Sequence, residues 1–178
     1  MQRRAFFNWR FVKRERRRSN KRWAVLLLFS IPAFVLCERG VISAGRVTDV
    51  SMLPTLMPGQ YFLINKYIFH LSKPRRGDIV ILRPPEDSRW HYVKRVVGLE
   101  GETIAISGGR VMINGQALEE PYARKPTEPA MEPRRIPEDA YFLMGDNRPN
   151  SEDSRSFGPV GRNRIEGKIK PGRIFSFW

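Results

Sequence analysis

Two residue types in apolar surroundings suggest nucleophilic catalysis. Ser51 lies in the proline-containing stretch DVSMLPTLMPG (residues 49–59), and Lys94 lies in HYVKRVVGLEGE (residues 91–102). Apolar surroundings disfavour the ammonium form of a lysine and so lower its pKa. A neutral amine can take the proton of a nearby serine hydroxyl, and Ser-Lys pairs are a variant of the Ser-His-Asp arrangement. The two residues are therefore candidates for a nucleophile and its general base.

The position of Lys94 in an expected strand determines its surroundings. If residues 92–97 form a strand, successive side chains alternate between two faces, so Lys94 and Arg95 point to opposite sides. Their neighbours are apolar on both faces, so at least one of the two cations meets an apolar environment. Lysine can lose its proton there, whereas arginine effectively cannot. The alternative is a lysine that points into solvent, which is where most lysines lie.

Metal and nucleotide chemistry are not supported by the sequence. The two histidines, His70 and His91, and the single cysteine, Cys37, have no spacing that zinc sites use. The stretch GDNRPNS (residues 145–151) has one glycine and lacks the Lys-Ser/Thr ending of a phosphate-binding loop. We therefore expect no metal ion and no cofactor.

The elements that would position these residues are mostly short strands. Gly108-Gly109 between two apolar runs is a hairpin signal, and Asn114-Gly115 marks another tight turn. Residues 119–138 contain five prolines and many charges, which favours an exposed extended loop within a small variable insertion at about 103–139. The expected strands are 60–67, 78–82, 92–97, 103–107, 110–113, 140–144 and 173–178.

The positive charge is concentrated near the N-terminus and is followed by an apolar segment. Of the formal net charge of +14, residues 1–22 contribute +9, through ten Lys and Arg against one Glu. Residues 23–37 carry no charge, and with apolar or small neighbours they predict a transmembrane anchor over 23–43. By the positive-inside rule, the basic arm 1–22 lies in the cytoplasm and residues 44–178 form an extracytoplasmic domain.

Other interpretations of the terminal segments are open. A cleavable secretory signal also has a basic start and an apolar run, but the small residues at 43–45 lie well beyond the run. Processing as a lipoprotein at Cys37 is disfavoured by the bulky Leu36 before it. We prefer an uncleaved anchor. At the other end, the aromatic residues within 175–178 could rest on lipid or belong to a closing strand.

Four motifs between residues 49 and 160 resemble the sequence boxes of the type I signal peptidases, also called leader peptidases. In order, they are SMLPTL (51–56), RRGDIVIL (75–82), YVKRVVGLEGE (92–102) and GDNRPNSEDSRSFGPV (145–160). The resemblance implies a membrane-bound serine endopeptidase that removes signal peptides from exported preproteins through a Ser-Lys dyad. It also implies a mainly β fold, with an antiparallel, barrel-like catalytic domain after an N-terminal transmembrane helix.

The resemblance assigns a role to individual residues. Ser51 would be the nucleophile, Lys94 the general base, and Ser151 the hydroxyl that orients the lysine. Asp153 and Arg155 would form a supporting charged pair, which we expect in an extended loop. The loop beneath the site would be shaped by Gly145, Asp146 and Asn147. The apolar substrate pockets would be lined by Met52, Leu56, Tyr92 and Val93. Two further residues, Arg95 and Arg148, would act structurally.

One residue departs from the family pattern. Two positions before the nucleophile the family usually has Ser or Gly, whereas this chain has Asp49. An ionised carboxylate cannot donate a hydrogen bond to an oxyanion, so the backbone N–H of Ser51 is the expected donor. Either a different group supplies the second donor or the activity is reduced.

Three alternatives stay open from the sequence. A self-cleaving repressor-type domain also uses Ser and Lys on a β fold, but it would follow a DNA-reading helical domain, which the sequence does not show. A membrane-anchored binding module would place the basic arm on RNA or anionic lipid beside a silent β scaffold. A mitochondrial inner-membrane peptidase would share the chemistry but not the location. We prefer a monomeric bacterial enzyme of the cell membrane, whose partners are preprotein signal peptides and the lipid bilayer, with no nucleic acid.

Overall fold

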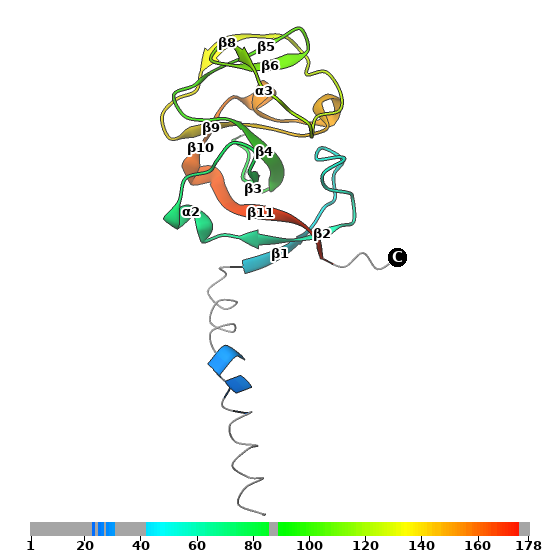
Figure 1. Cartoon of the computed structure of the whole chain (residues 1–178), viewed down its shortest axis with the longest axis vertical. Coiled ribbons are helices and arrows are strands. Elements are labelled where there is room, and N and C mark those ends of the chain that lie inside the picture. Colours follow the sequence, from blue (N-terminus) through cyan, green and yellow to red (C-terminus); the bar gives the residue numbers. More distant parts are fainter. Residues whose placement is uncertain (1–22, 24, 27, 31–41, 86–88, 175–178) are drawn as a thin grey trace, which may run out of the picture. The chain divides into compact units, whose positions relative to one another are not determined.

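The chain divides into two units, Met1–Val41 and Ile42–Trp178, which are described separately. The computed structural model describes residues 23, 25, 26, 28–30, 42–85 and 89–174 (Figure 1). In the first unit these residues are helical, and their side chains are exposed. The helical residues described there are too few to form a membrane-crossing helix. The basic arm, Cys37, most of the expected anchor and residues 175–178 lie outside the described residues.

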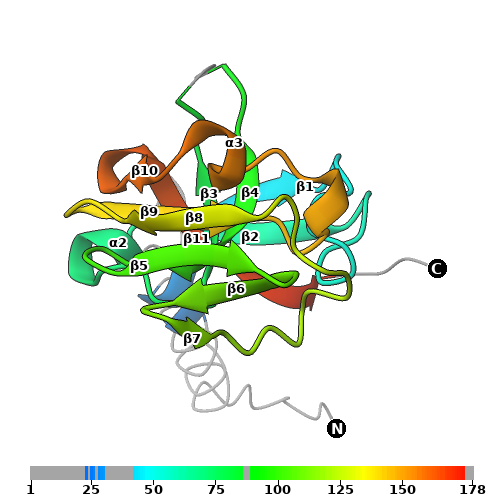
Figure 2. The same ribbon diagram turned by 90° about the horizontal axis from the view of Figure 1, so that it is seen from above.

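The second unit is built from two antiparallel β-sheets, which confirms the expected mainly antiparallel β fold. The larger sheet has seven strands in the order β1-β2-β11-β3-β4-β9-β10, and the smaller has four in the order β7-β6-β5-β8. Figures 1 and 2 show the smaller sheet lying over β9, near one end of the larger sheet. The described strands of the predicted antiparallel domain thus form two distinct sheets.

The strands are short, and brief helical turns connect them. The larger sheet contains β1 (Ile42–Arg46), β2 (Tyr61–Asn65), β3 (Ile79–Leu82), β4 (Tyr92–Gly98), β9 (Ala140–Met144), β10 (Val160–Gly161) and β11 (Ile165–Ile174). The smaller sheet contains β5 (Thr103–Ser107), β6 (Arg110–Ile113), β7 (Gln116–Ala117) and β8 (Met131–Arg135). The helical segments are α2 (Ile68–Leu71), η1 (Arg148–Asn150), α3 (Ser154–Phe157) and η2 (Arg162–Arg164).

Both tight turns expected in the smaller sheet are confirmed. Gly108 and Gly109 have φ angles of +57° and +75° and connect β5 to β6, with Ser107 paired to Arg110. Asn114 and Gly115, with φ angles of +50° and +82°, connect β6 to β7 in the same way. Two consecutive residues with positive φ form the turn that matches the twist of a hairpin. Glycine and asparagine are the residues that adopt this conformation most readily.

Two segments that pair as strands differ from the sequence predictions. Residues 42 and 43, assigned to the end of the anchor, belong to β1, which pairs with β2 from Ile42↔Asn65 to Arg46↔Tyr61. The segment 119–138, expected to be an extended loop, contains β8, which pairs with β5. The sequence of β8 is MEPRR, and four of its five residues are exposed. A charged edge strand of this kind lacks the apolar alternation by which strands are recognised.

The strand expected at 173–178 begins earlier than predicted. β11 spans Ile165–Ile174 and pairs with β3 through Ile165–Ile169 and with β2 through Lys168–Ile174. It carries two lysines, two glycines and a proline, a composition that is unusual for a strand between two others. Lys168 is accommodated because its Nζ pairs with Asp78 at 2.6 Å. Long-range pairing therefore overrides the weak local strand signal.

Candidate active site

The turn that carries Ser51 is fixed on one side by the hydrophobic core. Ser51 begins a turn between β1 and β2, and it is 4% exposed. The side chains of Met52 and Leu56 are buried in the cluster that contains Phe62 of β2. The Leu56 N–H also donates to the Met52 carbonyl at 3.0 Å. Apolar burial immediately after the serine holds the turn in one position against the sheet.

The same turn is fixed on the other side by Asn147. The Asn147 backbone N–H donates to the Ser51 carbonyl at 2.9 Å, and its side-chain amide donates to the Val50 carbonyl at 3.1 Å. Asn147 follows β9 in the segment Gly145–Asn147, hereafter called the GDN turn. The main chain of the nucleophile candidate is thus tied directly to the GDN turn, which the resemblance placed beneath the site.

Lys94 lies within hydrogen-bond distance of Ser51. It sits in β4, opposite Val80 of β3, and is 3% exposed. Its Nζ donates to Ser51 Oγ at 2.9 Å. Burial lowers the pKa of Lys94, whereas the nearby carboxylates of Asp153, Asp49 and Glu152 oppose this shift. Desolvation is the largest cause, so the site favours a neutral amine beside the hydroxyl.

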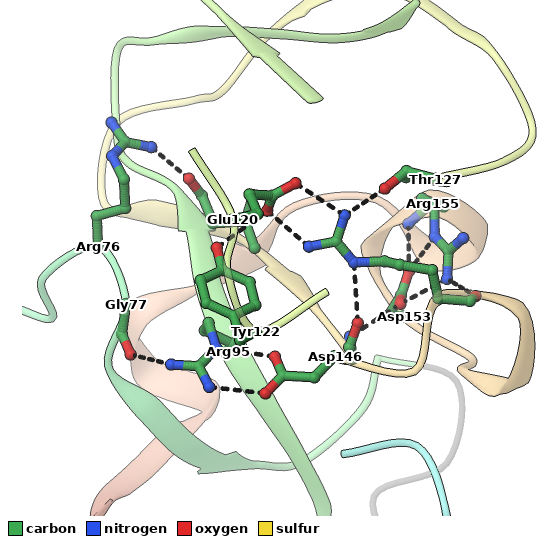
Figure 3. A network of polar contacts seen from close by, with 12 residues as sticks. Arg76, Gly77, Arg95, Glu120, Tyr122, Thr127, Asp146, Asp153 and Arg155 are labelled. Atoms are coloured by element: carbon green, nitrogen blue, oxygen red, sulfur yellow. Dashed lines mark hydrogen bonds and ion pairs between the residues drawn. The ribbon is translucent and has the colours of Figure 1, made fainter. Parts of the chain in front are cut away.

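The two neighbouring cations of β4 are both buried, so the expectation that at least one would be buried is confirmed. Arg95 forms a bidentate pair with Asp146, with Nε–Oδ1 and Nη2–Oδ2 distances of 2.8 and 2.6 Å. Its Nη1 donates to the Gly77 carbonyl at 2.8 Å, and the ring of Tyr122 covers the guanidinium with its centroid 4.0 Å away (Figure 3). Each polar edge of the buried guanidinium thus has a partner, which offsets the cost of burying its charge.

Gly145 is the residue of the GDN turn that packs closely against both Ser51 and Ser151. A Cβ atom built at this position would lie 2.6 Å from the Ser51 carbonyl oxygen and 2.2 Å from Ser151 Oγ. Only glycine therefore lets the GDN turn pass between the backbone of Ser51 and the side chain of Ser151. Its N–H donates to Asp153 Oδ2 at 3.0 Å, which holds the turn from a third direction.

Asp153 and Arg155 pair with each other, but not in the extended loop that we expected. Asp153 is the N-cap of α3, and its carboxylate accepts from the Arg155 N–H as well as from Arg155 Nε at 2.8 Å. Arg155 Nη2 also donates to the carbonyls of Arg148 and Ser151. A helix start satisfies the carboxylate with backbone donors, which a two-residue spacing in an extended chain would not do.

Ser151 lies beside the site without contacting the lysine. Its Oγ is buried and has no hydrogen-bond partner among the described residues. Ser151 Oγ lies next to Gly145, at 2.2 Å from the position that a Cβ atom of residue 145 would take. The next serine in the chain, Ser154, is the first residue of α3, and its hydroxyl instead accepts from the Leu143 N–H at 2.9 Å. The lysine-orienting role of Ser151 therefore stays a prediction.

A groove of about 520 Å³ opens onto the Ser-Lys pair. Its lining includes Ser51 and Lys94 together with all four residues predicted to form substrate pockets: Met52, Leu56, Tyr92 and Val93. It also includes residues 43–46 of β1 and the exposed Trp90, which the sequence analysis did not assign to the site. Residue 43 falls within the predicted anchor, and residues 44–46 lie in no predicted strand, so no sequence signal marked them as part of the site.

Asp49 also lines this groove, near the nucleophile. Its Oδ1 accepts from the Val50 N–H at 2.7 Å, and the side chain is exposed. No backbone hydrogen bond from the Ser51 N–H is found within the described part of the chain. The oxyanion-donor role of this N–H stays a prediction. No group of three metal-ligating side chains occurs among the described residues.

Comparisons with known proteins show the family of this chain. The family model described as "Signal peptidase, peptidase S26" matches residues 20–172. "Signal peptidase I" of Leptolyngbya laminosa is 38% identical over 162 residues, covering 87% of this chain and 75% of the relative. "Signal peptidase I T" of Bacillus subtilis (strain 168) is 35% identical over 159 residues, covering 83% of this chain and 82% of the relative.

A solved structure is also similar. The crystal structure of a signal peptidase I from Enterococcus faecalis V583 has a TM-score of 0.51 and 32% identity, and it covers 56% of this chain and 98% of that chain. The fold and the comparisons define a peptidase. The chain belongs to the signal peptidase family, peptidase S26. This membership decides against the self-cleaving repressor and the silent binding module.

Proposed function

We propose that this chain is a membrane-bound serine endopeptidase that cleaves N-terminal signal peptides from exported preproteins by a Ser51–Lys94 dyad. The observation that carries the proposal is the 2.9 Å distance between Lys94 Nζ and Ser51 Oγ, with both residues buried at the wall of a groove. Signal peptidase I is also the printed name of the relatives described above.

The reaction is an acyl transfer in two stages. Neutral Lys94 accepts the hydroxyl proton as Ser51 Oγ attacks the carbonyl carbon of the scissile peptide bond. The resulting ammonium then gives this proton to the leaving amine as the C–N bond breaks, which leaves an ester on Ser51. In the second stage Lys94 removes a proton from water, the hydroxide equivalent attacks the ester, and the proton returns to Ser51 Oγ.

The developing oxyanion receives a hydrogen bond from the Ser51 backbone N–H. Asp49 lies two residues earlier and cannot donate while it is ionised. Ser151, which the resemblance assigns to orienting Lys94, has a buried hydroxyl without a partner among the described residues, so this donor is available to the amine or to a water molecule. Asp153, Arg155 and the GDN turn hold these groups in place.

The groove supplies the substrate specificity. Met52, Leu56, Tyr92 and Val93 line it, and the family resemblance places small residues of the substrate against such positions. The substrate class is therefore a preprotein with small residues before the cleaved bond. Because signal peptides are apolar, a shared bilayer concentrates the substrate and the enzyme at one surface.

The N-terminal segment anchors the enzyme as a single-pass protein, with residues 1–22 in the cytoplasm, 23–43 as the approximate anchor and the following domain outside. Trp23, Val25, Leu26, Leu28 and Phe29 support this proposal because they are helical, apolar and more than half exposed. The β1 strand moves the outer boundary of the anchor to residue 41 or earlier. The relatives named above are bacterial, which favours the bacterial cell membrane over the mitochondrial inner membrane.

Cleavage of a preprotein by the purified full chain in lipid vesicles tests the proposal. The wild type is expected to release the signal peptide, whereas Ser51→Ala and Lys94→Ala are expected to lose at least about 10⁴-fold in kcat. Glu138→Gln, at an exposed residue outside the groove, serves as the control. Cleavage at the wild-type rate by Ser51→Ala would refute the dyad, and a wild type that cleaves no preprotein would refute the substrate assignment.

A further inference from the structure

The loop 119–128, which the sequence analysis treated as an exposed connection, enters the polar network beneath the dyad. The Glu120 side chain is only 9% exposed, and Thr127 is buried. The Thr127 N–H donates to the Gly109 carbonyl at 2.8 Å, which ties the loop to the β5–β6 hairpin. Buried polar groups in a loop are costly unless they have partners, so the contacts of these side chains indicate what the loop does.

Glu120 joins two neighbouring side chains at a single carboxylate. Its two oxygens accept from Arg148 Nη1 and Nη2 at 3.0 and 2.6 Å. The Tyr122 hydroxyl donates at 2.9 Å to Glu120 Oε1, the oxygen that also accepts from Arg148 Nη2. Burial is the largest cause that raises the pKa of Tyr122, and the Glu120 charge adds to it. Tyr122 therefore keeps its proton and remains a donor.

Through these two side chains, Glu120 is linked to both arginines that hold the GDN turn. Arg148 is 1% exposed, and its Nε donates to the Gly145 carbonyl at 3.0 Å. The guanidinium of Arg95 lies against the Tyr122 ring and donates two hydrogen bonds to Asp146 (Figure 3). Gly145 and Asp146 are thus held by Arg148 and Arg95. The loop 119–128 contacts both of these arginines, through Glu120 and Tyr122.

The third residue of the GDN turn, Asn147, holds the carbonyl of Ser51. A continuous set of contacts therefore runs from the loop through two arginines to the main chain of the nucleophile. We propose that Glu120 and Tyr122 are positioning residues, which set the place of Ser51 relative to Lys94 by fixing Arg148 and Arg95. The proposal rests on the dyad of the proposed function and adds a second support that lies outside the sequence boxes.

The test compares variants of the full chain in lipid vesicles with a preprotein substrate. Glu120→Gln removes the charge and leaves one oxygen for three donors, so kcat per folded molecule is expected to fall about 10- to 100-fold, as small displacements of a reacting group do. KM is expected to change little, because neither residue lines the groove. The pH at which the acid limb of kcat falls to half is expected to stay unchanged.

Tyr122 offers a graded series. Tyr122→Phe keeps the ring over Arg95 and loses only the hydroxyl, so its kcat is expected to fall less than that of Tyr122→Leu, which loses both contacts. Glu119→Gln is the matched control, because it makes the same change at the exposed neighbouring residue. Its kcat is expected to equal that of the wild type.

The folded fraction of each variant is measured by circular dichroism, at a temperature well below its melting transition. Wild-type kcat per folded molecule in both Glu120→Gln and Tyr122→Leu, even with a lower melting temperature, would overturn the proposal and leave the loop a role in stability only. A rise in KM alone, or a shifted acid limb with an unchanged plateau, would also overturn it. Failure of the dyad itself is separate, since it shows as full activity of Ser51→Ala.

Discussion

The two faces of β4 bury two adjacent cations in opposite ways. Arg95 has a bidentate carboxylate, a backbone carbonyl and an aromatic ring as partners. Lys94 has the hydroxyl of Ser51 at 2.9 Å and a ring at 5.2 Å, and the carboxylates that act on it do so without a hydrogen bond. A fully paired cation holds structure, whereas desolvation of a poorly paired lysine lowers its pKa and so favours the neutral amine.

This comparison explains how one short strand can supply both a support and the proposed base. The identity of each side chain matches its face, since arginine cannot be deprotonated in a protein and lysine can. The experiments below test whether the two cations differ in this way.

The largest expected effect is loss of activity at Lys94. Lys94→Met and Lys94→Arg are both expected to lower kcat by at least about 10⁴-fold, since neither side chain can accept the serine proton. Lys94→Met is expected to melt no lower than the wild type, because it removes a desolvated amine without leaving an unpaired charge. Lys73→Met, at an exposed lysine, is the control and should keep full activity. Retained cleavage by Lys94→Arg would contradict the role of Lys94 as the base.

On the other face, Asp146→Asn is expected to reduce stability rather than chemistry alone. The Arg95–Asp146 pair is buried, with side-chain exposures of 11% and 1%. Removal of the carboxylate leaves the guanidinium without its counter-charge, which costs about 3–5 kcal/mol in buried pairs. Urea unfolding measures the loss. The double variant Arg95→Met with Asp146→Asn should recover part of it, and equal stability of Asp146→Asn and the wild type would contradict the pairing.

A smaller effect is expected in the pH dependence of stability. Burial lowers the pKa of Lys94 in the folded chain from its ordinary value of 10.5, so the unfolded chain binds more protons in the interval between the two values. The free energy of unfolding should therefore rise with pH across this interval and level off above about 10.5. Lys94→Met should lack this component of the rise. Parallel curves for the two proteins would show that Lys94 titrates alike in both states.

The smallest expected effect is a shift of the pH–activity profile at Asp49. The charge of Asp49 raises the pKa of Lys94 and so opposes the effect of burial. Asp49→Asn should lower that pKa further and move the acid limb of kcat to lower pH. Glu138→Gln, at an exposed acid far along the chain, provides a comparison of equal charge change. Movement of the limb to higher pH in Asp49→Asn would contradict the electrostatic role of this residue.

The parts of the fold that could be predicted are those specified by neighbouring residues. Gly108-Gly109 and Asn114-Gly115 fix their turns by local conformation, and the apolar run IVIL of β3 is buried on both faces as its composition suggests. The Ser51–Lys94 pair could be proposed because burial of a lysine follows from the apolar residues on both sides of it. The prediction that these two residues, 43 positions apart in the sequence, contact each other came from the family resemblance and not from the local sequence pattern.

The parts that could not be predicted depend on contacts between distant segments. Glu120 and Tyr122 lie among prolines and charges, and nothing near them in the sequence reveals that they cover two buried arginines. The first two residues of β1, Ile42 and Ser43, fall within the predicted anchor because apolar and small residues suit either environment. In both cases the deciding partner, Arg148 for the loop and β2 for the strand, lies elsewhere in the sequence.

The order of strands in the larger sheet has a consequence for the proposed dyad. β11 follows every other described strand in sequence, yet it lies between β2 and β3. Within this sheet, the hairpin of β1 and β2, whose connection carries Ser51, is therefore paired with the strands that include Lys94 only through β11. A chain that lacks β11 has both Ser51 and Lys94 but not the strand through which their two parts of the larger sheet are paired. The last described strand in the sequence is thus the one that completes the sheet around the proposed dyad.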